Sequence, residues 1–187
     1  MFLFKKENSL ANHGSLKNAL LELSYYNSLN HPEKDPNIVW ANPISGYSSK
    51  ELSDETGIIK NSIDYIIELV EDELKVTVNS NKAYAQYYTQ TETEGNIYSD
   101  YVTGYTPEYQ PNKVALVYLG HDGWDSTIEF WNINISKESK IFENSFDLKL
   151  NDLLVYDTTL PHRFKPTTWG NHAGDSGLML TLFLNTT

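Results

Sequence analysis

A run of short, β-prone segments from Lys113 to Asn185 constrains the fold of this chain more than any other feature. Its most informative part is residues 151–166, NDLLVYDTTLPHRFKP. An Asn-Asp turn opens this part, the apolar run at 153–156 predicts a short strand, and Asp157 with two threonines closes that strand. His162 follows Pro161, which has no N–H to give to a strand ladder, so the histidine is expected where a strand begins at the edge or mouth of a sheet. The sequence therefore predicts a β-sheet protein with a histidine placed where a ligand can reach it.

Two amphipathic helices are predicted before this region. Apolar residues recur at spacings of three and four from Ser15 to Leu29, with Ser15 as the expected N-cap. A stronger stripe runs through residues 57–74, with Ser53 as the expected start of its helix. The members of this stripe are Ile59, Ile63, Ile66, Ile67, Val70 and Leu74. Both helices should pack their apolar faces on a sheet.

Length and composition indicate one domain. With 187 residues, of which 40% are hydrophobic, the chain can bury one substantial core. Within residues 1–187 we expect an N-terminal helical support region at 1–81 and a β core at 82–187, where helical periodicity gives way to tyrosine-rich segments. The absence of cysteine excludes disulfides, zinc-thiolate sites and thiol nucleophiles.

Charge and apolar runs restrict the location and the partners of the protein. The net charge of −11 disfavours nucleic acid, because binding to phosphates needs a basic surface. No apolar run reaches membrane-spanning length, and the start MFLFKKENS has too short an apolar part, in the wrong order, for a signal peptide. We therefore expect an acidic protein of the cytoplasm or of a virus particle. Its partner should be another protein or a small molecule, and it could form oligomers.

Three segments, taken in order, carry a resemblance to a known family. They are KVALVYLGHDGWDSTIEFWN, FDLKLNDLLVYDTTLPHRFKP and GLMLTLFLN. Together they resemble the iron(II)/2-oxoglutarate-dependent dioxygenases, in particular the short prolyl-4-hydroxylase-like members common in phage genomes, over roughly residues 82–185. The resemblance implies an α+β, mainly β fold. We expect a double-stranded β-helix (jelly roll) of two antiparallel sheets with about eight strands from Lys82 on, and N-terminal helices packed on one sheet.

The resemblance also implies a metal site. Members of the family bind iron with two histidines and one carboxylate, and the first pair is His-x-Asp, whose two side chains share one face of a strand. The matching stretch here is Tyr98-Ser99-Asp100, so the aspartate is present and Tyr98 stands in the position of the first histidine. His162 matches the second histidine. The resemblance thus places Asp100 and His162 in one cavity as metal ligands. An ionised Tyr98 or His121 could complete the set, and His13 and His172 are further possibilities.

The co-substrate position departs from the family pattern as well. Family members hold the far carboxylate of 2-oxoglutarate with an Arg or Lys at the start of the final strand. The single arginine, Arg163, directly follows His162, and neighbours on a strand face opposite ways, so Arg163 should not reach the same pocket. Between residues 170 and 178 the one group able to carry a positive charge is His172. His172 and Tyr118, from the YLG strand, are therefore the candidate co-substrate-binding residues.

Three functions remain open at this stage. A jelly-roll protein with lost or altered oxygenase activity would act as a binding or structural module, with association with a virus particle as one form of that role, and would need no cofactor. A working hydroxylase with an altered metal triad would need Fe(II) and 2-oxoglutarate. An unrelated jelly roll, such as a cupin-like sugar binder or a virion protein, would show a different strand order or a wide separation of Asp100 and His162. We favour the first, because both the metal triad and the co-substrate anchor depart from the family pattern.

Overall fold

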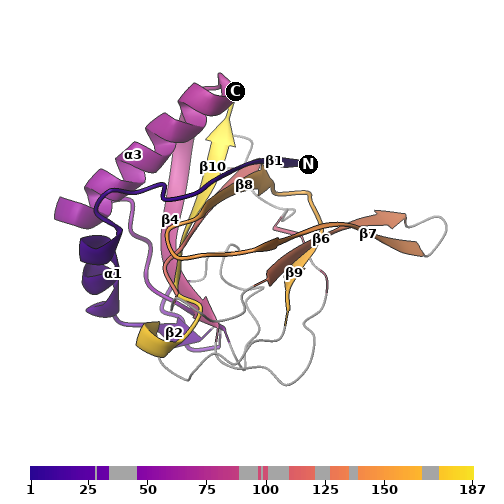
Figure 1. The fold of residues 1–187 in the computed structure, drawn as a ribbon. Helices are drawn as coiled ribbons and strands as arrows, with labels where there is room; N and C mark the ends of the chain where they lie inside the picture. Colours follow the sequence, from indigo (N-terminus) through magenta and orange to yellow (C-terminus); the bar gives the residue numbers. More distant parts are fainter. Residues whose placement is uncertain are drawn as a thin grey trace.

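The structure, a computed structural model, describes residues 1–27, 29–33, 46–88, 97, 99–100, 110–120, 127–134, 139–165 and 173–187. Within these residues two α-helices, one 3-10 helix and ten strands are formed (Figure 1). The helices are α1 (His13–Leu21), α3 (Gly57–Leu74) and the 3-10 helix η2 (Ala173–Asp175). The strands are β1 (Phe2–Lys6), β2 (Tyr26–Asn27), β3 (Gly46–Ser48), β4 (Val78–Tyr88), β5 (Lys113–Tyr118), β6 (Thr127–Asn134), β7 (Ser139–Asp147), β8 (Leu153–Asp157), β9 (His162–Phe164) and β10 (Met179–Thr186).

The strands form two antiparallel sheets. The larger has seven strands in the order β1-β8-β5-β10-β4-β3-β2, and the smaller has three in the order β7-β6-β9. Helices α1 and α3 cover one face of the larger sheet, and the smaller sheet lies on the side away from them (Figure 1). This helix–sheet–sheet arrangement is the double-stranded β-helix, so the predicted fold class is confirmed.

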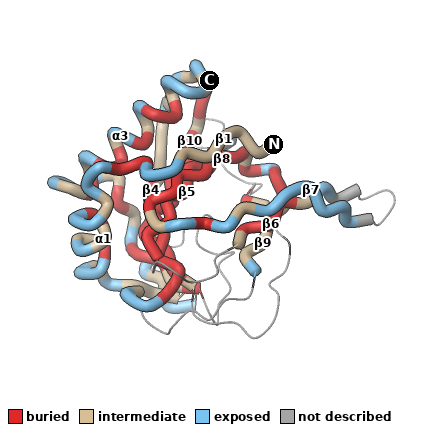
Figure 2. Tube along the Cα trace, viewed as in Figure 1, coloured by how far each residue is buried: buried red, intermediate tan, exposed pale blue. Residues whose placement is uncertain are grey.

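Alternation along the central strands assigns their side chains to two separate cores. On β4, Ala83, Ala85 and Tyr87 face the helices, whereas Tyr84 faces the smaller sheet. The central strand β10 follows the same rule, with leucines at 180, 182 and 184 toward the helices and Met179 and Phe183 toward the smaller sheet. Figure 2 shows the resulting band of buried residues along β4, β5, β8 and β10. Any site between the two sheets must therefore be built from the second set of positions.

The helix predicted for residues 57–74 is confirmed, but its predicted start at Ser53 and the predicted bounds of the first helix are wrong. Helix α3 begins after Thr56, so Ser53 is not its start. The helix predicted to run from Ser15 to Leu29 instead follows Asn12 and ends at Leu21. Beyond it, residues 26 and 27 pair with residues 48 and 47 as β2 and β3. A sheet partner distant in sequence thus overrides the local helical period.

The N-terminal part contributes strands as well as helices, although it was expected as a helical support region. Strand β1 pairs antiparallel with β8 at the sheet edge, and β3 pairs with β4 at the other side. Strand β4 itself starts at Val78, before the expected boundary at Lys82. In the described residues, seven strands (β4–β10) stand against the eight or so expected from Lys82 on, and three more strands come from the residues before them.

None of the helices in the described residues is both long enough and apolar enough to cross a lipid bilayer.

Candidate functional site

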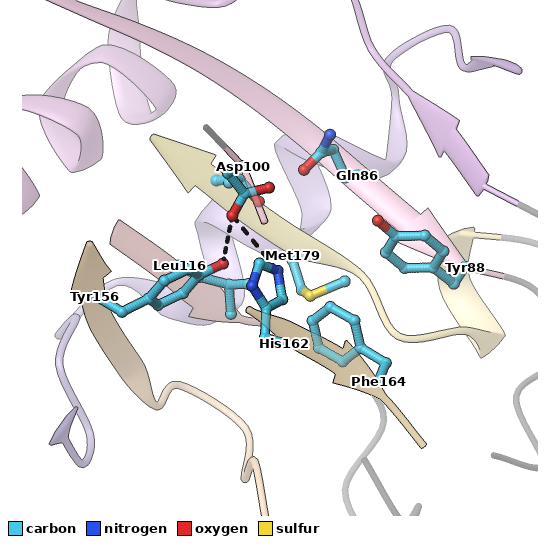
Figure 3. Close-up of a pocket in the computed structure, with 9 residues that line it drawn as sticks. Gln86, Tyr88, Asp100, Leu116, Tyr156, His162, Phe164 and Met179 are labelled. Atoms are coloured by element: carbon cyan, nitrogen blue, oxygen red, sulfur yellow. Dashed lines mark hydrogen bonds and ion pairs between the residues drawn. The ribbon is translucent and has the colours of Figure 1, made fainter. Parts of the chain in front are cut away.

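Between the two sheets, nine side chains enclose a small cavity (Figure 3). They are Gln86, Tyr88, Asp100, Leu116, Tyr156, His162, Phe164, Met179 and Thr181. The cavity volume is about 10 Å³, which is enough for about one water molecule. The lining combines a carboxylate and an imidazole with mostly apolar or uncharged neighbours. In this form the cavity could hold a single small atom group next to the Asp100–His162 pair.

His162 is the first residue of β9, and its imidazole is fixed in orientation. Its Nδ1 lies 2.9 Å from the carbonyl oxygen of Leu160. A carbonyl only accepts hydrogen bonds, so Nδ1 carries a proton and donates it. In the neutral ring, Nε2 then presents its lone pair to Asp100, whose Oδ2 lies 3.4 Å away. A backbone acceptor that fixes the far nitrogen is the usual support of a metal-binding histidine.

Asp100 is almost fully buried, with 2% of its surface exposed. The Tyr156 hydroxyl donates a hydrogen bond of 3.2 Å to Asp100 Oδ2. Burial raises the pKa of Asp100 above its ordinary value, and the opposing effects of His162 and Tyr156 do not cancel this rise. Burial, together with the charge of Asp100, also raises the pKa of Tyr156 well above 10. Tyr156 therefore remains a phenol and serves as a hydrogen-bond donor.

The structure brings Asp100 and His162 into one cavity, as the sequence led us to expect. Tyr98, His121 and His172 lie outside the described residues. Tyr118 is buried in the same apolar core between the sheets, but it is not among the nine cavity residues. Its ring occupies the space that a side chain at Gly120 would need.

Of the nine cavity residues the sequence predicted only Asp100 and His162, and the seven that it missed include Tyr156, Gln86 and Thr181. Tyr156 is the last residue of the apolar run at 153–156, which predicts a strand and gives no sign of a polar role. Gln86 lies between Tyr84 and Tyr88 in period two on β4, so alternation could have placed it on the cavity face. Thr181 shares the cavity face of β10 with Met179 two residues before it. For Gln86 and Thr181, the alternation of side chains along β4 and β10 therefore contains the information that they face the cavity.

Arg163 points away from the cavity, as predicted from its place beside His162. Its Nε donates a 2.8 Å hydrogen bond to Glu129 Oε2, and its guanidinium lies 5.1 Å from the centre of the Trp131 ring. Lys165 Nζ reaches the other Glu129 oxygen at 3.1 Å. Arg163 of β9 and Lys165, which directly follows β9, are thus both engaged with Glu129 on the outer side of the smaller sheet.

Substitution of Glu129 by glutamine is expected to lower the free energy of unfolding by roughly 1.5–3 kcal/mol at pH 7, the typical contribution of hydrogen bonds to a charged group. Burial acts to raise the pKa of Glu129, but the hydrogen bonds from Arg163 and Lys165 outweigh burial, so its pKa is lowered. An acid with a lowered folded pKa stabilises the protein above its unfolded pKa of about 4.3 and loses this effect as pH falls through the folded value. The difference between wild type and variant should therefore disappear at low pH.

Urea unfolding of both proteins across a pH series measures this difference. Glu143→Gln is the matched control, because it changes an exposed carboxylate of β7. A loss of stability that is the same at every pH would show that the glutamine disturbs packing and that the charge of Glu129 plays no part.

Asp100 and His162 are placed as two ligands of one divalent metal ion would be. Two ligands ~2.1 Å from one ion, at ~90–109° to each other, lie ~3.0–3.4 Å apart. The 3.4 Å between His162 Nε2 and Asp100 Oδ2 lies at the upper end of this range. No third His, Asp or Glu joins this pair among the residues with described positions. The pair is thus suited to a metal ion and incomplete as a triad within the described part of the chain.

No known protein family matches the sequence, and no curated protein matches it either. Solved structures do resemble the fold. A prolyl-4-hydroxylase from Pseudomonas putida has a TM-score of 0.56 and 12% sequence identity, over 97% of this chain and 91% of that chain. HygX from Streptomyces hygroscopicus, solved with nickel and 2-oxoglutarate bound, has a TM-score of 0.51 and 13% identity, over 96% of this chain and 81% of that chain. At these identities the similarity establishes the shared fold.

Proposed function

We propose that this chain, which has the fold of the iron(II)/2-oxoglutarate oxygenases, is a binding module that has lost the oxygenase reaction and retains a weak divalent-metal position at Asp100 and His162. The observation that supports this most is the lining of the cavity. Apart from Asp100 and His162, the other seven side chains are uncharged, and no Lys or Arg stands among the nine. A dicarboxylate would therefore find no cationic side chain in the described lining.

The sequence supports the same proposal from a second direction. An oxygenase of this fold uses about five anchoring groups, three for iron and two for 2-oxoglutarate. Here Tyr98 replaces the first histidine, and no Arg or Lys occurs between residues 170 and 178. Each such bond is typically worth ~1.5–3 kcal/mol. Two lost bonds correspond to roughly two to four decades of affinity.

A working hydroxylase with an altered triad is the second candidate, and one observation favours it. The hydrogen bond from His162 Nδ1 to Leu160 holds Nε2 toward Asp100 at 3.4 Å. If an iron ion were bound there, it would supply the position at which oxygenases of this fold activate oxygen. In either case Tyr156 would orient the carboxylate through its hydroxyl, and the apolar side chains of Leu116 and Met179 would limit water.

Anaerobic titration with Fe(II) and 2-oxoglutarate separates the two candidates. We expect at best weak binding of Fe(II) and no visible charge-transfer band of a chelated complex when 2-oxoglutarate is added. Thermal stabilisation provides a second reading of binding. HygX is a suitable positive control, because its structure contains nickel and 2-oxoglutarate.

Three variants make the titration specific. Asp100→Ala and His162→Ala should remove the weak metal binding, whereas His13→Gln, which changes a histidine of α1 outside the cavity, should leave it unchanged. Micromolar binding of both Fe(II) and 2-oxoglutarate, lost in the first two variants, would overturn the proposal in favour of the hydroxylase.

The proposal includes the partner. With a net charge of −11, the chain is suited to a small molecule or a protein and not to nucleic acid. A place in the cytoplasm or in a virus particle belongs to the same proposal.

A further inference from the structure

Two buried polar groups next to the Asp100–His162 pair have no hydrogen-bond partner among the described residues. Gln86 and Thr181 are 3% and 4% exposed. Among the described residues, Gln86 Nε2 and Thr181 Oγ1 have no hydrogen-bond partner. Both side chains line the cavity that contains Asp100 and His162. Buried polar groups are nearly always hydrogen-bonded, so two orphans in one cavity need an explanation.

Strand register explains why these two groups meet. Residue Met179 of β10 lies opposite Gln86 of β4, and Thr181 follows two residues along β10 on the same face. Gln86 and Thr181 are therefore diagonal neighbours on adjacent strands. At this spacing long side chains can come into contact with each other. Figure 3 shows the Gln86 amide above the space between Asp100 and Met179, with its oxygen as the amide atom nearer to Asp100. One ligand atom between the two strands could contact both groups.

The chemistry of the two groups restricts the ligand. The Gln86 amide nitrogen only donates hydrogen bonds, so the atom that it meets must be an acceptor, which excludes a cation. An anion would face the Asp100 carboxylate without a Lys or Arg among the cavity residues. An uncharged oxygen acceptor satisfies both conditions, and the apolar side chains of Leu116 and Met179 suit the carbon atoms that carry it.

We propose that Gln86 and Thr181 form a hydrogen-bonding subsite for the uncharged carbonyl oxygen of a small ligand, such as an amide or a ketone, beside the Asp100–His162 pair. The proposal rests on the proposed binding function and names its ligand class. Tyr88 and Phe164, only partly buried and with ring centres 5.5 Å apart, stand where the two sheets meet at the cavity. The rotation of these two rings would enlarge a cavity that now has room for about one water molecule.

The first test measures the melting temperature of the protein without any ligand. Thr181→Val replaces a hydroxyl that has no hydrogen-bond partner within the described part of the chain, and it should raise the melting temperature by about 2–4 °C. Thr186→Val is the matched control on the same strand, because the Thr186 hydroxyl donates a 2.9 Å hydrogen bond to Asn112 Oδ1. The control should melt at a lower temperature than the wild type. A fall or no change for Thr181→Val would show that its hydroxyl is bonded within the protein and would overturn the proposal.

The second test uses three small probes at equal concentrations: acetamide, acetate and methylammonium. The readout is the side-chain amide resonance of Gln86 in nitrogen-15 spectra, assigned by its absence in Gln86→Leu. We expect acetamide alone to shift this resonance, and Thr181→Val to weaken the binding roughly 2- to 10-fold. An equal response to acetate or to methylammonium would overturn the inferred ligand class. No response to any probe would show that the cavity holds a buried water only.

The two proposals can fail separately. The metal titration reports on Asp100 and His162, whereas the melting and probe experiments report on Gln86 and Thr181 in metal-free protein. If the metal titration fails, the melting and probe experiments can still be interpreted, and the reverse is also true.

Discussion

A divalent metal ion is expected to bind the Tyr98→His variant about 10- to 150-fold more tightly than the parent protein. The reason is the spacing in Tyr98-Ser99-Asp100, which matches the His-x-Asp spacing of the family pattern and puts residue 98 two positions before Asp100. One recovered ligand bond of ~1.5–3 kcal/mol corresponds to this gain in affinity. Residue 98 lies outside the described part of the structure, so the prediction depends on the sequence spacing and on the observed position of Asp100 beside His162.

Anaerobic titration with Co(II), followed by its visible absorption, measures this gain. Ser99→His is the matched control, because the adjacent residue on an extended chain faces the opposite way and should not add a ligand. The double variant Tyr98→His with His162→Ala should lose the gain. Equal gains in Tyr98→His and Ser99→His would mean that the added histidine binds metal outside the cavity, and the inferred triad position would be wrong.

Substitution of Leu180 by alanine is expected to lower the free energy of unfolding by about 3–5 kcal/mol, a large part of the ~5–15 kcal/mol typical of a domain. Leu180 lies on the central strand β10 and is fully buried under the helices. Its neighbours across the sheet are Ala85 of β4 and Val117 of β5, which are too small to fill the cavity left behind. Urea unfolding at neutral pH measures the loss.

Leu29→Ala is the control for this substitution. Leu29 is 78% exposed, so the same change of side chain removes little buried surface there. We expect a change within about 0.5 kcal/mol for the control. Similar losses for both variants would mean that Leu180 is not packed in the core between the sheet and the helices.

The apolar periodicities of the sequence predicted the central parts of the fold and missed its edges. The apolar stripe of helix α3 was predicted over its observed residues 57–74, although Ser53 is not its start, because the isoleucine stripe has no competing signal. Strand β1 was not predicted, because only its pairing with β8, about 150 residues away in the chain, makes those residues a strand. Tyr26 was assigned to a helix for the same reason. Local patterns do not contain the identity of a distant strand partner.

The site shows the same division. Asp100 and His162 could be paired from the sequence through the family resemblance, since each stands in a recognisable position. Gln86 and Thr181 could not be paired in this way, because their meeting depends on the register of β4 against β10. A shift of one residue in that register would turn one of the two away from the cavity. The ligand class inferred from these two residues could therefore be derived only from the tertiary structure.

The central place of β10 also has a consequence for the order of folding. Strand β10 is the most C-terminal strand described, yet it lies between β4 and β5, which do not pair with each other. Before residues 179–186 are in place, β4 and β5 each expose an open edge able to pair with another extended segment. The larger sheet must then close in one late step that joins its two halves and sets the register of Gln86 and Thr181 at the same moment. Chains delayed before that step would be open to aggregation, and an intact cavity would mark completed folding.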